Sequence, residues 1–162
     1  MAIETLDGAP VATGPEDPSA PQLSLQAVYL KDCSYEAPHG PRIDGAWNPQ
    51  VSLDLHTSVN ALSTELREVV LTVTVSAKQN DVTLFLVEVK QAGAFVMRNL
   101  SEDGVRRAVG SVCPGLLFPY VRATVSQLVT LGGFPQFLLP PVNFEALYTQ
   151  SVAGPQPGVT RN

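Results

Sequence analysis

Apolar and polar residues alternate in four segments within the first ninety residues of the chain. The alternation runs through residues 23–36, 51–56, 68–76 and 85–90, where close to every second side chain is apolar. A period of two residues is that of a β-strand with one buried face. Four such strands, each with one polar face, predict an antiparallel sheet.

In the first of these segments the alternation predicts that six apolar side chains share one face: Leu23, Leu25, Ala27, Tyr29, Cys33 and Tyr35. Residues 78–81 form a short polar stretch that predicts a hairpin turn between the third and fourth strands. The connection over 37–49 is longer, rich in Pro and Gly, and contains Trp47. A long connection after a first strand, followed by a meander, is compatible with a Greek key.

Two helices should follow the strands. Ser101 is a good N-cap, and the two acidic residues that follow it favour the first turn of a helix. This helix should end near Val112, since Pro114 interrupts it. A second helix should follow Pro119, with an apolar stripe on one side. The pair Gly132-Gly133 should end it.

A third, short helix should begin after Asn143, a favourable N-cap, and extend over 144–152. Strands followed by helices predict an α+β fold: a four-stranded antiparallel Greek-key sheet with helices packed on one face. The chain has 162 residues, which suits one domain. That domain should cover 22–152, between a disordered N-terminal arm over 1–21 and a flexible tail over 153–162.

Composition narrows the possible partners. Charged residues make up 15% of the chain, against roughly 25% in typical soluble domains. So few charges suggest that apolar surface is covered in an oligomer or presented to a partner. The net charge of −5 argues against nucleic-acid binding. The first residues lack the features of a signal peptide, and we find no run of ~18 apolar residues that would span a membrane, so we expect a cytoplasmic protein.

Few residues offer catalytic chemistry. His39 and His56 lack a recognisable nucleophile context and are better explained as exposed or hydrogen-bonded side chains. Cys33 and Cys113 do not make a disulfide framework and should be buried thiols. Neither a tightly spaced metal-ligand pair nor a phosphate-binding loop is present in the sequence. We therefore expect no enzyme activity, no metal, no cofactor and no use of ATP.

The polar side of the sheet carries an acidic group. Asp32 and Glu36 are four residues apart in a strand and project to one face. Leu86 and Glu88 share that face if the odd-numbered residues of the fourth strand point toward the helices. We call these four residues the acidic face. They are consistent with an ordinary solvated sheet surface, or with a docking site for a basic partner.

Aromatic residues gather in loops and at helix ends, in both the long connection and the C-terminal part: Trp47, Phe95, Phe118, Tyr120, Phe134, Phe137, Phe144 and Tyr148. Aromatic side chains usually belong to a core. The stretch 134–141 is too rich in Pro for regular structure, however, and an irregular apolar strip can also form the wall of a groove for extended peptides.

Several motifs resemble the SecB family of bacterial export chaperones. They are YLKDCSYEAP at 29–38, WNP at 47–49, CPGLLFPY at 113–120, and FPQ followed by PVNFEAL within 134–147. The motifs occur in the family's order and spacing, and the resemblance covers nearly all of 23–150.

The resemblance implies a function. SecB-like proteins are ATP-independent holdases that bind unfolded precursors of exported proteins in the cytoplasm and pass them to the SecA motor ATPase. They form homotetramers, as dimers of dimers, without inserting into the membrane. Apolar grooves would trap extended segments of a client, with about 25 cal/mol gained per Å² of apolar surface buried.

The resemblance also implies roles for individual residues. The acidic face (Asp32, Glu36, Leu86 and Glu88) matches the family's docking surface for the motor, whose basic tail binds its own zinc. Trp47, Phe95, Tyr120 and Phe137 match aromatic positions around the client groove. Phe85, Val87, Val89 and Gln91 match positions linked to assembly or client binding. The helix over 119–131 should pack the two dimers together, and the first strand should pair subunits within each dimer.

The chain departs from the family at its two ends. The N-terminal arm is longer than usual, and the C-terminal tail lacks the acidic residues often found there. An alternative is a SecB-like holdase that serves a toxin–antitoxin system or general cytoplasmic proteostasis. Such a protein would share the grooves but could lose the acidic face, so the presence of all four residues favours export.

Overall fold

The computed structural model describes residues 17–154. Most of the predicted arm and tail, residues 1–16 and 155–162, therefore lie outside the described residues. The end of the arm, 17–21, forms a turn in which Ser19 donates two hydrogen bonds to Asp17. The amide of Asn99 holds this turn by donating to the carbonyl oxygens of Pro18 and Ala20, at 2.8 and 3.2 Å.

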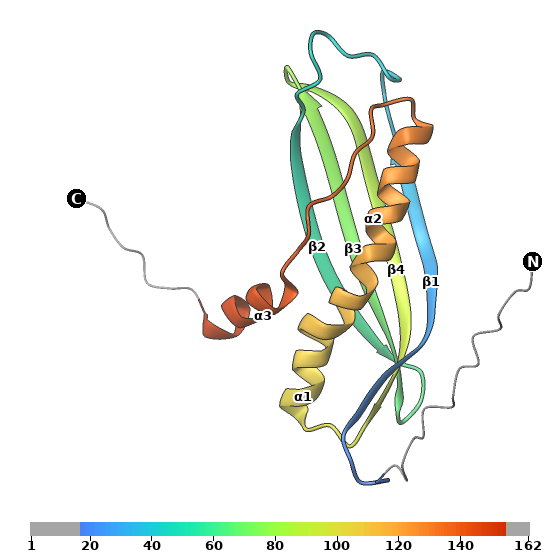
Figure 1. Cartoon of the computed structure of the whole chain (residues 1–162), viewed down its shortest axis with the longest axis vertical. Coiled ribbons are helices and arrows are strands. Elements are labelled where there is room, and N and C mark those ends of the chain that lie inside the picture. The colour runs from blue at the N-terminus through green and yellow to red at the C-terminus, as the bar shows by residue number, and fades with distance from the viewer. Residues whose placement is uncertain (1–16, 155–162) are drawn as a thin grey trace, which may run out of the picture.

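Four long antiparallel strands form one sheet: β1 (Gln22–Glu36), β2 (Gln50–Ala61), β3 (Leu66–Gln79) and β4 (Val82–Arg98). Their order is β1-β4-β3-β2, so β2, β3 and β4 make a meander and β1 lies beside β4 (Figure 1). The long connection over 37–49 carries the chain from one edge of the sheet to the other. This topology confirms the predicted Greek key and α+β class.

The turn between β3 and β4 forms where the polar stretch predicts it. Asn80 and Asp81 have φ angles of +52° and +62°. A two-residue turn with both central residues in the left-handed region matches the right-handed twist of the strands, and Asn and Asp tolerate that conformation well. The hairpin therefore follows from local chemistry.

The alternation in β1 is broken twice, which corrects its predicted faces. The pairing with β4 skips one residue between Leu25 and Ala27 and another between Leu30 and Asp32. Each skipped residue makes a β-bulge, after which side chains point to the opposite side. Ala27 and Tyr29 thus lie on the other face from the rest of the predicted apolar set. The residue pattern did not reveal this because bulges carry no fixed sequence signal.

The first two predicted helices are one continuous helix of three parts. These are α1 (Glu102–Arg107), a single π-helical stretch η1 (Ala108–Val112), and α2 (Cys113–Leu131). The prediction that the helix breaks at Pro114 and restarts after Pro119 was wrong. The predicted start and end were right: Ser101 caps the helix by accepting a hydrogen bond from the Gly104 N–H at 3.0 Å, and the helix ends at Gly132-Gly133.

The π-helical stretch explains why the first proline is tolerated. At its end, the Cys113 N–H donates to the carbonyl of Ala108, five residues earlier. The wider turn already interrupts the regular bonding, so the missing N–H of Pro114 removes little. Pro119 would crowd the carbonyl of Gly115, but that glycine is exposed. The carbonyl can therefore tilt toward solvent.

The long helix crosses the sheet diagonally and covers one face, which we call the inner face (Figure 1). Odd-numbered residues of β3 and β4 point into this layer together with one stripe of α2. The larger fully buried members include Val69, Leu71, Val73, Val75, Phe85, Val87, Val89, Phe95, Leu117, Val121, Val125 and Val129. These side chains form the core that the strand and helix periodicities predict.

A strap over residues 132–143 leaves α2, runs back over the inner face and leads to α3 (Phe144–Ala153) (Figure 1). Asn143 caps α3 by accepting a hydrogen bond from the Ala146 N–H at 2.9 Å, as predicted. Glu145 anchors the helix, since it accepts a hydrogen bond from Ser111 at 2.7 Å and pairs with Arg107. α3 is thus fastened to η1.

The fused helix has a property that the sequence did not predict. By length and composition it could cross a membrane, with a mean hydropathy of 1.2 over its best 18-residue window. However, 44% of that window is buried inside the molecule. A stripe of α2 packs on the sheet, and the core helix of a soluble protein has the same properties.

Candidate functional site: an acidic sheet face and an apolar groove

The four residues of the acidic face lie together on the outer face of the sheet, opposite the helix. Across the β1–β4 pair, Glu36 lies opposite Leu86 and Ser34 lies opposite Glu88. Asp32 follows one row further along. The second bulge of β1 is what turns this end of the strand to the outer face, in phase with the even-numbered residues of β4. Leu86 is 37% exposed, so the group offers both charge and apolar contact.

The charge of the acidic face extends across the sheet. In the row of Glu88, Thr74 of β3 is followed by Asp54 of β2. Thr74 Oγ1 lies 3.4 Å from Glu88 Oε2, and the Lys90 ammonium lies 3.7 Å from Glu88 Oε1. Both members of that ion pair are about 41% exposed, so solvent screens it. Asp54 is a further acidic residue that sequence reasoning did not single out.

A second polar group lies on the outer face, around Glu68. Its carboxylate accepts hydrogen bonds from Tyr29 at 2.5 Å, from Lys31 at 2.6 Å and from Asn60 at 3.2 Å. We call these four residues the carboxylate network. The sequence suggested no such network, although a lone acidic residue beside the apolar run over 69–71 was a possible signal.

Hydrogen bonding controls the protonation of this network. The bonds from Lys31 and Tyr29 lower the pKa of Glu68 to about 2, against the opposing effect of its burial. The same bond, with burial and the neighbouring charge, raises the pKa of Tyr29 to about 12. Glu68 is 8% exposed. A buried carboxylate is therefore held in its charged form.

The aromatic residues predicted around a client groove separate into three places. Trp47 and Phe137 join one cluster, in which ring centroids are 5.9 Å apart for Trp47 and Phe134, 5.4 Å for Phe134 and Phe85, and 5.8 Å for Phe85 and Phe137. Phe95 is fully buried. Tyr120 is 49% exposed on α2. The structure thus brings together two of the four.

The four predicted assembly residues of β4 line the inner face. Phe85, Val87 and Val89 have no exposed surface, and Gln91 is 4% exposed. Phe85 touches both strap aromatics of the cluster, so it links the sheet to the strap. A change at these positions would act through the core and not by direct contact.

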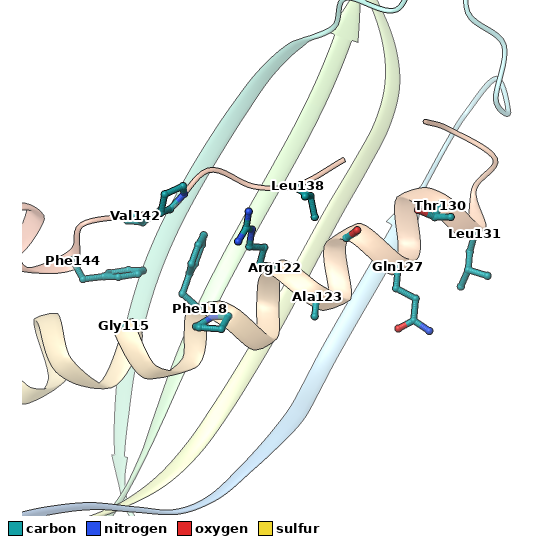
Figure 2. Close-up of a pocket in the computed structure, with 13 residues that line it drawn as sticks. Gly115, Phe118, Arg122, Ala123, Gln127, Thr130, Leu131, Leu138, Val142 and Phe144 are labelled. Carbon is teal, nitrogen blue, oxygen red and sulfur yellow. The ribbon is translucent and has the colours of Figure 1, made fainter. Parts of the chain in front are cut away.

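An apolar groove of about 790 Å³ lies between α2 and the strap (Figure 2). Its apolar walls include Phe118 and Leu131 from α2, Leu138 and Val142 from the strap, and Phe144 at the start of α3. A neighbouring hollow of about 600 Å³ shares part of this wall and continues toward η1. Together they make a long trough beside the helix. The periodic stripe of α2 did not predict it, because the lining residues come from the opposite side of the helix.

Arg122 is the charged residue in the lining of the apolar groove. Figure 2 shows Arg122 and Phe118 pointing from α2 toward the strap. The Nε atom of Arg122 is buried and has no hydrogen-bond partner. A groove of this kind favours apolar segments and tolerates an acceptor group near the guanidinium.

The remaining candidate residues lie apart. His39 and His56 are exposed, on the long connection and on β2 respectively. Cys113 is buried, and burial raises the pKa of its thiol to about 12. Cys33 is exposed, which corrects its prediction as a buried thiol, because β1 is the edge strand of the sheet. Within residues 17–154, no group of three or more potential metal ligands comes together.

Comparison with known proteins places the chain in a family. The family model described as "Preprotein translocase subunit SecB" matches residues 16–154. Similar relatives named "Protein-export protein SecB" occur in Pseudomonas fluorescens, Pseudomonas aeruginosa and Hahella chejuensis. The identities are 48% over 138 residues, 46% over 142 and 44% over 138. These matches cover 85–86% of this chain and 87% of each relative.

A solved structure supports the fold. A Mycobacterium tuberculosis SecB-like chaperone, in complex with a peptide from an antitoxin, aligns with a TM-score of 0.65 and 16% identity. The alignment covers 74% of this chain and 90% of that one. At this identity the likeness concerns the fold alone. The family match and the relatives show that the chain belongs to the SecB family of protein-export chaperones.

Proposed function

We propose that this protein is an ATP-independent holdase. It binds unfolded precursor proteins in the cytoplasm, keeps them competent for export, and delivers them to the SecA motor ATPase. The SecB family is a chaperone family and not an enzyme family. The proposal adds the mode of action and the partner for this chain.

The observation that carries the proposal is the apolar trough beside α2, in a chain of this family. Large apolar side chains are exposed along it and near it: Leu131 is 76% exposed and Leu138 is 52% exposed. An extended apolar segment of a non-native protein would gain about 25 cal/mol per Å² that it buries there. A native protein has already buried such segments, so the groove selects unfolded clients.

The client-binding surface that we propose includes the aromatic cluster. Trp47 and Phe137 are partly exposed, and Phe137 precedes Leu138 of the groove wall in the strap. Tyr120 adds exposed aromatic surface on α2. Phe95 supports the sheet from within. The sheet surface under the helix and strap is formed in part by Phe85, Val87, Val89 and Gln91. Substitutions there would therefore alter client binding and assembly together.

The acidic face is the proposed docking surface for SecA. Three carboxylates with one exposed leucine suit a basic partner surface, through charge complementarity and a small apolar contact. This surface lies on the opposite side of the sheet from the trough. A client and the motor could therefore occupy one chaperone at the same time.

We propose that the protein assembles as a homotetramer, a dimer of dimers. β1 is an edge strand whose unpaired backbone groups can pair with a second copy. Leu131 is 76% exposed at the end of α2, and packing of the helix over 119–131 between two dimers can cover such side chains. The low charged fraction of the chain fits surface shared between these contacts and clients.

The test is light scattering while a denatured, slow-folding precursor is diluted into buffer without nucleotide. Stoichiometric chaperone should suppress aggregation, and the client should be recovered in complex with it. Continued aggregation in the presence of folded tetramer would contradict the holdase proposal. Tight binding to an antitoxin, without binding to SecA, would instead favour a toxin–antitoxin role, and client binding without either partner would favour general proteostasis.

A further inference from the structure

Glu68 is unusual among the described residues because its charged side chain is buried, although it lies on the outer face of the sheet that the helix does not cover (Figure 1). Its partners come from both sides of it. Asn60 belongs to the neighbouring strand β2, whereas Tyr29 and Lys31 belong to β1, which is separated from β3 by β4. The carboxylate network therefore spans all four strands.

Small residues in β4 make this crossing possible. Ala94 lies opposite Glu68 on one side and opposite Ala27 on the other, and Ala92 lies opposite Tyr29. Both alanines are buried. Side chains of ordinary size at these two positions would stand between β1 and Glu68. The tyrosine and lysine instead reach over the alanines to the carboxylate.

The network holds β1 at its second bulge. Lys31 is the extra residue of that bulge, and Tyr29 lies two residues before it. Without the bulge, Asp32 would lie opposite Val89 and point to the inner face, and Glu36 would point inward with it. The bulge thus determines whether the β1 half of the acidic face is available to a partner.

We infer that Glu68 is a positioning residue for the acidic face. By accepting hydrogen bonds from Tyr29 and Lys31 it fixes the second bulge, and the bulge keeps Asp32 and Glu36 beside the β4 half of the acidic face. This inference rests on the proposed docking of SecA to that face. It assigns a role to residues outside the acidic face itself.

Replacement of Lys31 gives a test in which two explanations predict opposite changes in the affinity for SecA. If Lys31 were only a nearby positive charge, Lys31→Met would strengthen binding of a basic partner by removing repulsion. If Lys31 holds the bulge, the same change should weaken binding of purified SecA by roughly fivefold, a typical coupling between residues of one network. Lys31→Arg keeps a cation within reach of Glu68 and should restore most of the affinity.

Lys90→Met is the matched control. Lys90 lies on the same face and directly opposite Asp32, but it makes no hydrogen bond to Glu68. Its replacement removes the same charge and should strengthen binding of SecA. If Lys31→Met shifts the affinity in the same direction as Lys90→Met, the positioning role is overturned.

Two further readouts separate this inference from the docking proposal. Glu88→Lys acts on the acidic face directly; if it leaves SecA affinity unchanged, the docking proposal fails and the positioning role fails with it. Hydrogen–deuterium exchange should show faster exchange over residues 29–36 in Lys31→Met than in Lys90→Met, with β2 and β3 unchanged. Unchanged protection of 29–36 would overturn the inference even if SecA binding were weakened.

Discussion

At the residue scale, the chain separates charges that serve a surface from a charge that serves the fold. The residues of the acidic face are exposed or half-buried. Two lie at even-numbered positions of β4, and two lie in β1 after its second bulge. Glu68 lies on the same side of the sheet but is buried and fully engaged with three partners. Neighbouring carboxylates on one sheet face thus have different physical roles.

The stability of the protein should depend on pH through Glu68. Its folded pKa of about 2 lies below the ordinary value of 4.5, so the ionised form stabilises the fold. That contribution is complete above the unfolded pKa and is lost as the pH falls from about 4.5 toward 2. In urea unfolding measured across this window, Glu68→Gln should flatten the loss of stability seen in the wild type.

Glu65→Gln is a matched control for the pH dependence. Glu65 also pairs with a cation, Arg98, but the side chains of both are nearly half exposed, so solvent screens the pair. Its replacement should change the acid dependence less than Glu68→Gln does. An equal effect of the two substitutions would mean that the burial of Glu68 does not increase its contribution to the pH dependence of stability.

Charge reversal on the acidic face should affect SecA and spare the client. Glu88→Lys, or Asp32→Lys, places a positive charge opposite the expected basic surface and should weaken SecA binding by about tenfold or more. Client capture should not change, because the trough lies on the other side of the sheet (Figure 1). The mass of the tetramer should not change either, because pairing at the β1 edge would use backbone groups and not these side chains. Calorimetric titration of SecA, with aggregation assays in parallel, measures both effects. Intact affinity for SecA in both variants would refute the docking surface.

At the element scale, local signals and tertiary packing contributed differently. The strands, the turn at Asn80 and the caps at Ser101 and Asn143 were predictable, because each depends on residues close in sequence. The continuity of the long helix was not, since a π-helical stretch and an open glycine accommodate the two prolines. The bulges of β1 escaped prediction, and so did the α2 side of the trough, because both arise only when distant segments pack together. The strip over 134–141 had two interpretations from the sequence, core or groove wall, and Leu138 and Pro141 from it do line the groove.

The strap is the element that joins the core to the proposed client surface. Phe137 is partly buried in it and meets Phe85 edge to face, with centroids 5.8 Å apart. Phe137→Ala should lower client affinity by about fivefold to tenfold, as for an aromatic anchor in a binding site. SecA affinity should stay near that of the wild type. Competition with a labelled unfolded client measures the first effect.

The same variant can reveal a purely structural role for Phe137. If its replacement reduced client and SecA affinity equally, or unfolded the protein, the ring would be a core residue. Thermal unfolding of the variant shows which case applies. Glu88→Lys provides the reciprocal control, since it should reduce SecA affinity and leave the client affinity unchanged.

At the scale of the whole molecule, the sheet separates the two proposed binding surfaces. The inner side carries the long helix, the strap and the trough, and the outer side carries the acidic face. A holdase that must hand over its client needs this separation, because the motor can then dock before the client leaves. The central claim is that one chaperone binds client and motor on opposite sides of one sheet.

The most direct measurement is a titration of the chaperone with the basic, zinc-binding tail of SecA, first alone and then saturated with an unfolded client. The tail alone is the better probe, because it lacks the rest of the motor and is not expected to hold clients itself. With separate surfaces, the affinity for the tail should change by no more than about twofold on saturation with client. If client and tail displaced each other, they would share one surface, and the claim of two opposed surfaces would be contradicted.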